Sequence, residues 1–186
     1  MKKRIHPQFL LLFAALTAWQ CTDRGPKPVT GSLEISYRLN MVDSTVIPSY
    51  QTAIWLEDEK GTYIRSLLVS DYLSYGGFND STICPDWRKK VNWDTIPDAE
   101  FDAVTAATPQ IRAHTLLTEL AGLSLKEGVY RYYVETHIQE KYNVLYSGTI
   151  ELKGRETEST ATASYVPEEF ILASNLLSNV TAAYNP

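Results

Sequence analysis

The sequence has very little cysteine, with only Cys21 and Cys84 among its 186 residues. Neither belongs to a CxxC motif or to the cysteine and histidine spacings that bind zinc or an iron–sulfur cluster. If Cys21 carries a lipid, as argued below, only Cys84 is left, and an intrachain disulfide is excluded. The sequence leaves open whether Cys84 is buried, which is the commoner fate of a lone cysteine, or reactive.

Basic residues are also too few for some functions. The chain has 17 lysines and arginines against 22 aspartates and glutamates, and its net charge is −5. Removing Lys2, Lys3 and Arg4 with an N-terminal signal lowers the net charge to −8. A nucleic-acid-binding domain needs a basic surface for the phosphate backbone, so this composition excludes nucleic acid as a partner.

No apolar run is long enough to cross a bilayer comfortably, since that takes about 20 residues. The longest run begins at Phe9 and ends near Ala18, after the basic residues, and this order is typical of an export signal. Cys21 follows closely, as in bacterial lipoproteins, where that cysteine becomes the lipidated first residue. The alternative is an ordinary secretory signal that is cut nearby.

The lipoprotein interpretation divides the chain into three parts. Residues 1–20 are the signal peptide, residues 21–31 are a polar, proline-containing tether, and residues 32–186 form a single domain. The protein is then expected in the cell envelope, as a periplasmic or outer-membrane lipoprotein held to the membrane through Cys21.

No catalytic motif can be identified. No GxSxG elbow frames a serine, and no nucleophile and base can be paired. His114 and His137 lie on predicted strands without a second ligand residue at metal-binding spacing, so a structural role is favoured for both. The acidic pair Glu57 and Glu59 lies beside a turn, where solvated charges are expected. A hydrolase is therefore the least favoured function.

Alternating apolar and polar residues predict a β-rich domain. "LEISYRL" has the alternation of a half-buried strand, and Gly61 supplies the turn of a hairpin. Helix is predicted in "CPDWRKKVNW", where Pro85 suits the first turn. The predicted strands span about residues 33–39, 50–58, 62–73, 111–120, 129–139, 144–152 and 160–166, with an amphipathic stretch at 167–180. The fold class is all-β, an antiparallel β-sandwich with one or two short helices in loops.

The long segment after the hairpin lacks periodicity and is rich in aromatic residues. These can cover one end of the sandwich as part of the core, which is the favoured interpretation, or they can stack on a planar ligand. The basic run in the same segment is either a solvated helix face or a phosphate site near a helix start. The aromatic residues are Tyr72, Tyr75, Phe78, Trp87 and Trp93, and the basic residues are Arg88, Lys89 and Lys90.

The next segment, "DAVTAATP" at residues 102–109, consists almost entirely of small residues. One interpretation is a turn in which Asp102 and Thr105 hydrogen-bond to their own backbone. The other is a hydroxyl displayed for modification, because small neighbours let the chain enter another protein's active site and Pro109 limits its conformations.

Four segments carry a resemblance to a known family: "YQTAIWLEDEKGTYIRSLLVS", "CPDW", "DAVTAATP" and "EGVYRYYVE…YSGTIEL". Together they resemble the periplasmic domain-of-unknown-function family 2271 (DUF2271) over about residues 50–153. The resemblance implies an exported protein with an antiparallel immunoglobulin-like β-sandwich related to the flagellar hook-capping protein.

"DAVTAATP" is also similar to the acceptor motif of flavin transferases, Asp-x-x-Ser/Thr-Gly/Ser-Ala-Thr/Ser. Those enzymes link FMN through a phosphoester to the last hydroxyl of the motif. The resemblance implies that Asp102 is the recognition acid, that Thr105 and Ala107 fit the motif, and that Thr108 bears the FMN. Ala106 departs from the usual glycine or serine.

The function expected on these grounds is an extracytoplasmic electron carrier with covalently attached FMN and no substrate turnover of its own. Its expected partners are a flavin transferase and a membrane redox protein. Trp87, Trp93 or Tyr75 are then candidates for stacking on the flavin, and Arg88 and its neighbouring lysines for its phosphate. The alternative is a binding or structural module of the cell envelope without a cofactor.

Overall fold

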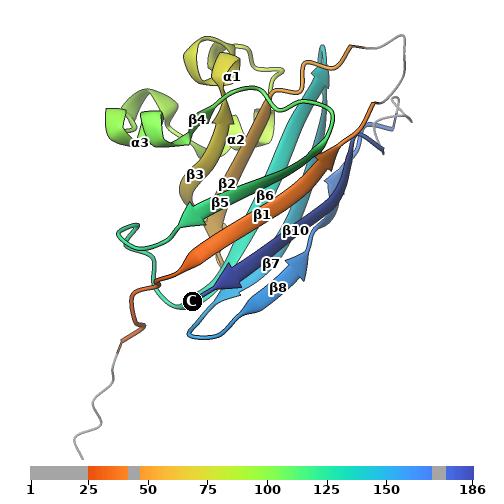
Figure 1. Cartoon of the computed structure of the whole chain (residues 1–186). Helices are drawn as coiled ribbons and strands as arrows, with labels where there is room; N and C mark the ends of the chain where they lie inside the picture. Colours follow the sequence, from red (N-terminus) through yellow and green to blue (C-terminus); the bar gives the residue numbers. More distant parts are fainter. Residues whose placement is uncertain (1–24, 42–46, 169–174) are drawn as a thin grey trace, which may run out of the picture.

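The computed structural model describes residues 25–41, 47–168 and 175–186, which fold into two β-sheets packed face to face (Figure 1). One sheet has the strand order β5-β1-β10-β8 and the other the order β4-β3-β2-β6-β7-β9. Neighbouring strands are antiparallel except β3 and β4. The predicted all-β sandwich is confirmed. The strands are β1 (Ser32–Leu39), β2 (Thr52–Asp58), β3 (Tyr63–Ser70), β4 (Thr105–Ala106), β5 (Ala113–Glu119), β6 (Gly128–Gln139), β7 (Tyr142–Leu152), β8 (Thr157–Thr160), β9 (Thr162–Tyr165) and β10 (Leu177–Asn185).

The inner faces of the two sheets enclose the main core. Along β1, Leu33, Ile35 and Leu39 are buried and alternate with more exposed residues, as the sequence pattern predicts. Strand β2 differs because it is buried on both faces. Ile54 belongs to the inner core, whereas Trp55 belongs to a second apolar cluster on the outer face of the six-stranded sheet. A strand covered on both faces is apolar along most of its length.

The second cluster exists because the segment between β3 and β5 covers the outer face of the six-stranded sheet with short helices (Figure 1). The helix predicted near Pro85 is confirmed as α2. The expected one or two helices are too few, because two more helices of five and seven residues flank α2 and are too short to show a helical period. The helical elements are α1 (Asp71–Tyr75), α2 (Pro85–Lys90), α3 (Asp98–Val104) and the 3-10 turns Gly77–Asn79 and Trp93–Thr95.

Strands β2 and β3 form the predicted hairpin. Gly61 in its turn has φ of +82°, a left-handed conformation that glycine adopts without steric cost. The third strand was predicted to continue to Leu73, but β3 ends at Ser70 and Leu73 is a buried residue of α1.

The last segment was predicted to be an amphipathic stretch. Where the structure describes it, from Leu177 onward, it is instead strand β10. It pairs with β1 and lies inside the four-stranded sheet. The register shifts opposite Ser36 and Arg38, and Asn179 at this bulge has φ of +51°. One extra residue therefore separates the buried Leu177 from the buried Val180, and this spacing of three resembles a helical period.

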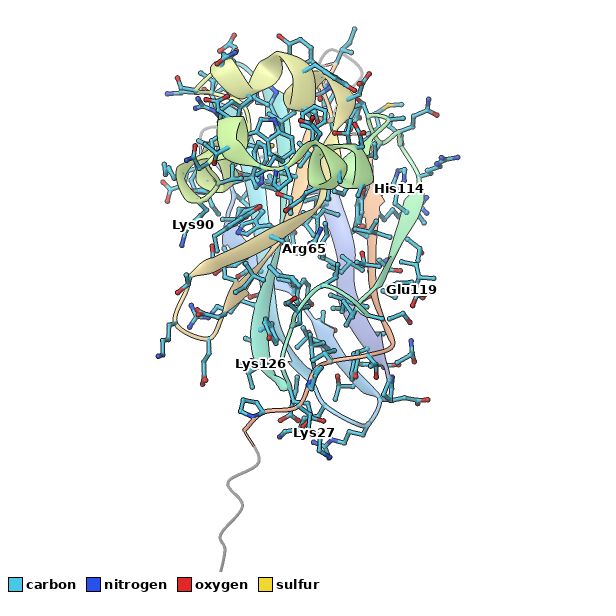
Figure 2. All side chains as sticks on the ribbon, turned by 90° about the vertical axis from the view of Figure 1, so that its left-hand side faces the viewer. Lys27, Arg65, Lys90, His114, Glu119 and Lys126 are labelled. Carbon is cyan, nitrogen blue, oxygen red and sulfur yellow. The ribbon has the colours of Figure 1, made fainter. Side chains whose placement is uncertain are left out.

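Part of the segment assigned to the tether lies on the domain. Val29 is buried, and its N–H donates to the carbonyl of Leu125 at 2.9 Å, while Glu127 N–H donates to the carbonyl of Lys27 at 2.8 Å. Figure 2 shows Lys27 and Lys126 at the end of the sandwich far from the helices. The predicted signal peptide and Cys21 lie outside the described residues.

Candidate functional site

The "DAVTAATP" segment is an irregular loop only in its last part. Its first residues complete α3, and the next two form β4, which pairs with β3 through Val69 and Thr105 and through Ser70 and Ala106. The loop begins at Ala107 and leads to β5. The first five residues of the segment close the helical segment onto the sheet. In the last three, Ala107 is exposed, Thr108 is partly exposed and Pro109 is buried.

Asp102 and Thr105 occupy different environments. Asp102 is exposed in α3. The Thr105 hydroxyl donates to the carbonyl of Phe101 at 2.8 Å and lies 3.1 Å from the Ser74 hydroxyl. Thr105 thus bonds to local backbone, as the turn interpretation predicts, and its hydroxyl is engaged in holding the end of α3.

Thr108 is held by Gln51, a buried residue just before β2. The Gln51 side-chain oxygen accepts the backbone N–H of Leu73 at 3.2 Å, so the amide nitrogen is the end that faces Thr108. That nitrogen donates to Thr108 Oγ1 at 3.0 Å. The threonine oxygen is therefore an acceptor, and its own proton is not used in this contact. An ester oxygen can also accept, so the contact is compatible with a modified Thr108.

A polar pocket of about 230 Å³ opens beside Thr108, with walls from β1, β3, β5 and the loop that carries Thr108. Arg112 and His114 line it, and the guanidinium of Arg112 brings nitrogen donors. His114 Nε2 donates to the carbonyl of Gln110 at 2.7 Å, and its ring stacks on that of Tyr37 with centroids 5.2 Å apart. Sites for small molecules usually measure roughly 300–1,000 Å³. This pocket therefore suits a phosphate group and not a whole flavin.

The basic run of α2 does not belong to this pocket. Lys90 Nζ lies 3.1 Å from Glu57 Oε1, and Arg88 places its guanidinium over the ring of Phe78. Glu57 was expected to be solvated, but it is buried, and Lys90 pairs with it there. Figure 2 shows Lys90 and His114 on opposite sides of the helical end. The structure therefore does not bring this run to the pocket beside Thr108.

The tryptophans of the helical segment are core residues, as favoured from the sequence. Trp87 is fully buried and donates its indole N–H to Ser66 Oγ at 2.9 Å, and the buried Trp93 donates to the carbonyl of Ser74 at 3.0 Å. Neither ring is available to stack on a flavin. Tyr75 is 71% exposed, but it does not line the pocket beside Thr108.

Cys84 is buried. Burial raises the pKa of its thiol well above the ordinary value, and the charge of the nearby Glu135 raises it further. Glu135 is itself fully buried, and its two oxygens accept the N–H groups of Asp86 and Trp87 at 3.2 and 2.9 Å. Since Cys84 provides no side-chain cap for α2, Glu135 satisfies these amides and ties β6 to the helical segment.

Sequence reasoning missed Gln51 and Glu135 because their partners come from distant segments. It assigned no role to Arg112, although Arg112 lies close to Thr108 in the sequence. The structural role expected for His137 is supported by its Nδ1, which lies 2.6 Å from Ser49 Oγ, and burial lowers its pKa. Within the described residues, no three acidic, histidine or cysteine side chains gather as a metal site. None of the helices in those ranges has the length and apolarity that crossing a bilayer requires.

Residues 32–167 match the model of a family described as predicted periplasmic proteins, DUF2271. The match confirms the family resemblance and extends it beyond residues 50–153. No curated protein and no solved structure matches the chain.

Proposed function

This chain belongs to the DUF2271 family of predicted periplasmic proteins, and we propose that it is an extracytoplasmic electron carrier with FMN esterified to Thr108. The observation that carries the proposal is the setting of the Thr108 hydroxyl. Its oxygen accepts a hydrogen bond from Gln51, and it lines the polar pocket with Arg112 and His114.

The residue types fit the phosphate end of FMN. Arg112 is a permanent cation at the pocket, and guanidinium groups bind phosphate oxygens through paired N–H donors. Gln51 keeps the ester oxygen in place without requiring its proton. Ala107 beside the acceptor is exposed and small, which leaves room for the active site of a transferase. When bound, FMN supplies reversible electron transfer.

The attachment step balances with FAD as the co-reactant, delivered by a flavin transferase. Thr108 Oγ1 bonds to the phosphorus on the riboflavin side of FAD. The bond from that phosphorus to the bridging pyrophosphate oxygen breaks, AMP leaves, and the hydroxyl proton passes to a base of the transferase.

The position of Thr108 suits a carrier on a lipid tether. Strand β1 begins at the end of the sandwich that holds Lys27, and it finishes beside the loop of Thr108, where Leu39 N–H donates to the carbonyl of Arg112. The loop between β4 and β5, which carries Thr108, therefore lies at the end of the sandwich away from the start of β1 (Figure 1). With Cys21 lipidated, that end would face away from the membrane, toward a redox partner.

The test is an intact mass after export from cells that also produce a flavin transferase. We expect the mass to rise by one FMN less one water. Thr108→Ala should abolish the gain and Thr108→Ser should retain it. Thr115→Ala is the matched control, since Thr115 lines the same pocket outside the motif. An unmodified wild-type mass, when a known acceptor is labelled in parallel, would leave the cofactor-free binding module as the better reading.

A further inference from the structure

A second, open groove adjoins the polar pocket at Thr108. It is formed by Tyr50, Thr108, Pro109, Gln110 and Ile111 and measures about 540 Å³, within the roughly 300–1,000 Å³ of ligand sites. None of these residues is charged. The tyrosine ring, the proline and the isoleucine make it mainly apolar, unlike the pocket that holds Arg112 and His114.

The two hollows share the wall formed by Thr108, Pro109 and Gln110, so Thr108 lines both of them. We infer that Tyr50, Pro109 and Ile111 form the seat for the isoalloxazine ring of an FMN on Thr108, with the phosphate on the side of Arg112. This inference rests on the proposed function. The anionic phosphate would lie in the pocket that contains Arg112, and the planar, largely apolar ring would lie in the mainly apolar groove.

Tyr50 is fixed in a costly conformation. Its φ is +53°, in the left-handed region that a bulky residue rarely adopts. Such strain persists where the surroundings determine it, and it is concentrated at ligand sites. Here the surroundings are the inner core, against which the ring packs, and the Thr52 hydroxyl, which donates to the Tyr50 carbonyl at 3.0 Å.

The strained residue also links the two parts of the site. Tyr50 immediately precedes Gln51, so one short stretch of backbone places both the apolar wall and the donor that holds Thr108 Oγ1. Within the described residues, the tyrosines that line a hollow next to Thr108 are Tyr37 and Tyr50. Tyr37 is buried, and its ring already stacks on that of His114. Tyr50 is therefore the aromatic face left for a planar ring.

The experiment compares flavin fluorescence in flavinylated wild type, Tyr50→Leu and Ile111→Ser. A tyrosine stacked on a flavin quenches its emission, and a docked ring is shielded from iodide. Losing the aromatic contact should lower the ratio of docked to free ring about 2- to 10-fold, so emission and iodide quenching both rise. Tyr165→Leu is the matched control, since Tyr165 is a half-exposed tyrosine on β9 at the far edge of the six-stranded sheet.

The outcomes separate the two proposals. If the wild type gains no FMN, the proposed function fails and the inference falls with it. If all proteins are flavinylated but Tyr50→Leu and Ile111→Ser behave like wild type, the groove is not the seat and the carrier function stands. Ile111 is 47% exposed, so its variant gives the answer even if Tyr50→Leu does not fold.

Discussion

Replacing Glu135 with glutamine should change how the stability of the domain depends on pH. The Glu135 side chain is fully buried between β6 and the start of α2. Burial disfavours the charged carboxylate and raises its pKa from 4.5 to about 8, although the N–H groups of Trp87 and Asp86 act in the opposite direction. The charge of Asp86 raises this pKa and that of Lys89 lowers it, each by less.

The sign of the effect follows from proton binding. Between pH 4.5 and about 8 the folded state keeps the proton on Glu135 that the unfolded state has lost. The free energy of unfolding is therefore greatest below pH 4.5 for this group and falls as the pH rises toward 8. Since one pKa unit corresponds to about 1.4 kcal/mol, the loss by pH 8 is at most about 5 kcal/mol.

Urea unfolding of the mature domain, followed by far-UV circular dichroism from pH 5 to pH 8, measures this loss. Glu135→Gln removes the titration, and because its amide group faces two N–H donors the variant should be about 1–3 kcal/mol less stable than the wild type with Glu135 protonated. The wild type should be more stable than the variant at pH 5, and this advantage should shrink steadily by pH 8. Glu158→Gln, at an exposed position of β8, is the control. Parallel profiles for wild type and Glu135→Gln would refute the reasoning.

Three further predictions concern packing, reactivity and anchoring. Gly148→Ala should lower the free energy of unfolding by about 1–3 kcal/mol through overpacking, because its Cβ would lie 2.5 Å from the Tyr132 hydroxyl oxygen. Urea titration measures this loss, with Gly76→Ala as the control because nothing lies within 4 Å of a Cβ at that position. Equal losses for the two variants would contradict the prediction. Cys84 should resist a thiol reagent at pH 8 in the native protein and react fully in urea, because burial raises its pKa; fast native labelling would show that the site opens. Cys21→Ala should move the protein from the membrane to the soluble fraction, and unchanged membrane association would exclude the lipid anchor.

The strands that the sequence predicts well are those with one buried face, such as β1. Strand β2 was also found, because its apolar run is short and bounded by turn signals. The sequence misled in β10, where the bulge at Asn179 breaks the alternation and brings Leu177 and Val180 to a helical spacing. A bulge forms between two paired strands, so it is not visible in either strand alone.

The residues of the candidate site also differ in whether the sequence alone identifies them. Thr108 and its small neighbours were identified from local composition and from the resemblance to an acceptor motif. Gln51 and Tyr50 were not, because they are distant from Thr108 in the sequence, and Arg112 was not, because nothing in its neighbourhood indicates a role in a site. Gln51 and Tyr50 reach the loop of Thr108 through the pairing of β2 with β3 and of β3 with β4, which brings residues 57 positions apart into hydrogen-bonding contact.

The sequence by itself determined the class of fold, the family and the place of the candidate hydroxyl, because each depends on residues close together in the chain. The tertiary structure decided which surroundings that hydroxyl has. It buried Trp87 and paired Lys90 with Glu57, which removed them from the site, and it placed Tyr50 and Gln51 beside Thr108. The physical reason is that burial and partner choice depend on how the two sheets and the helical segment pack, and packing joins residues that the linear chain keeps apart.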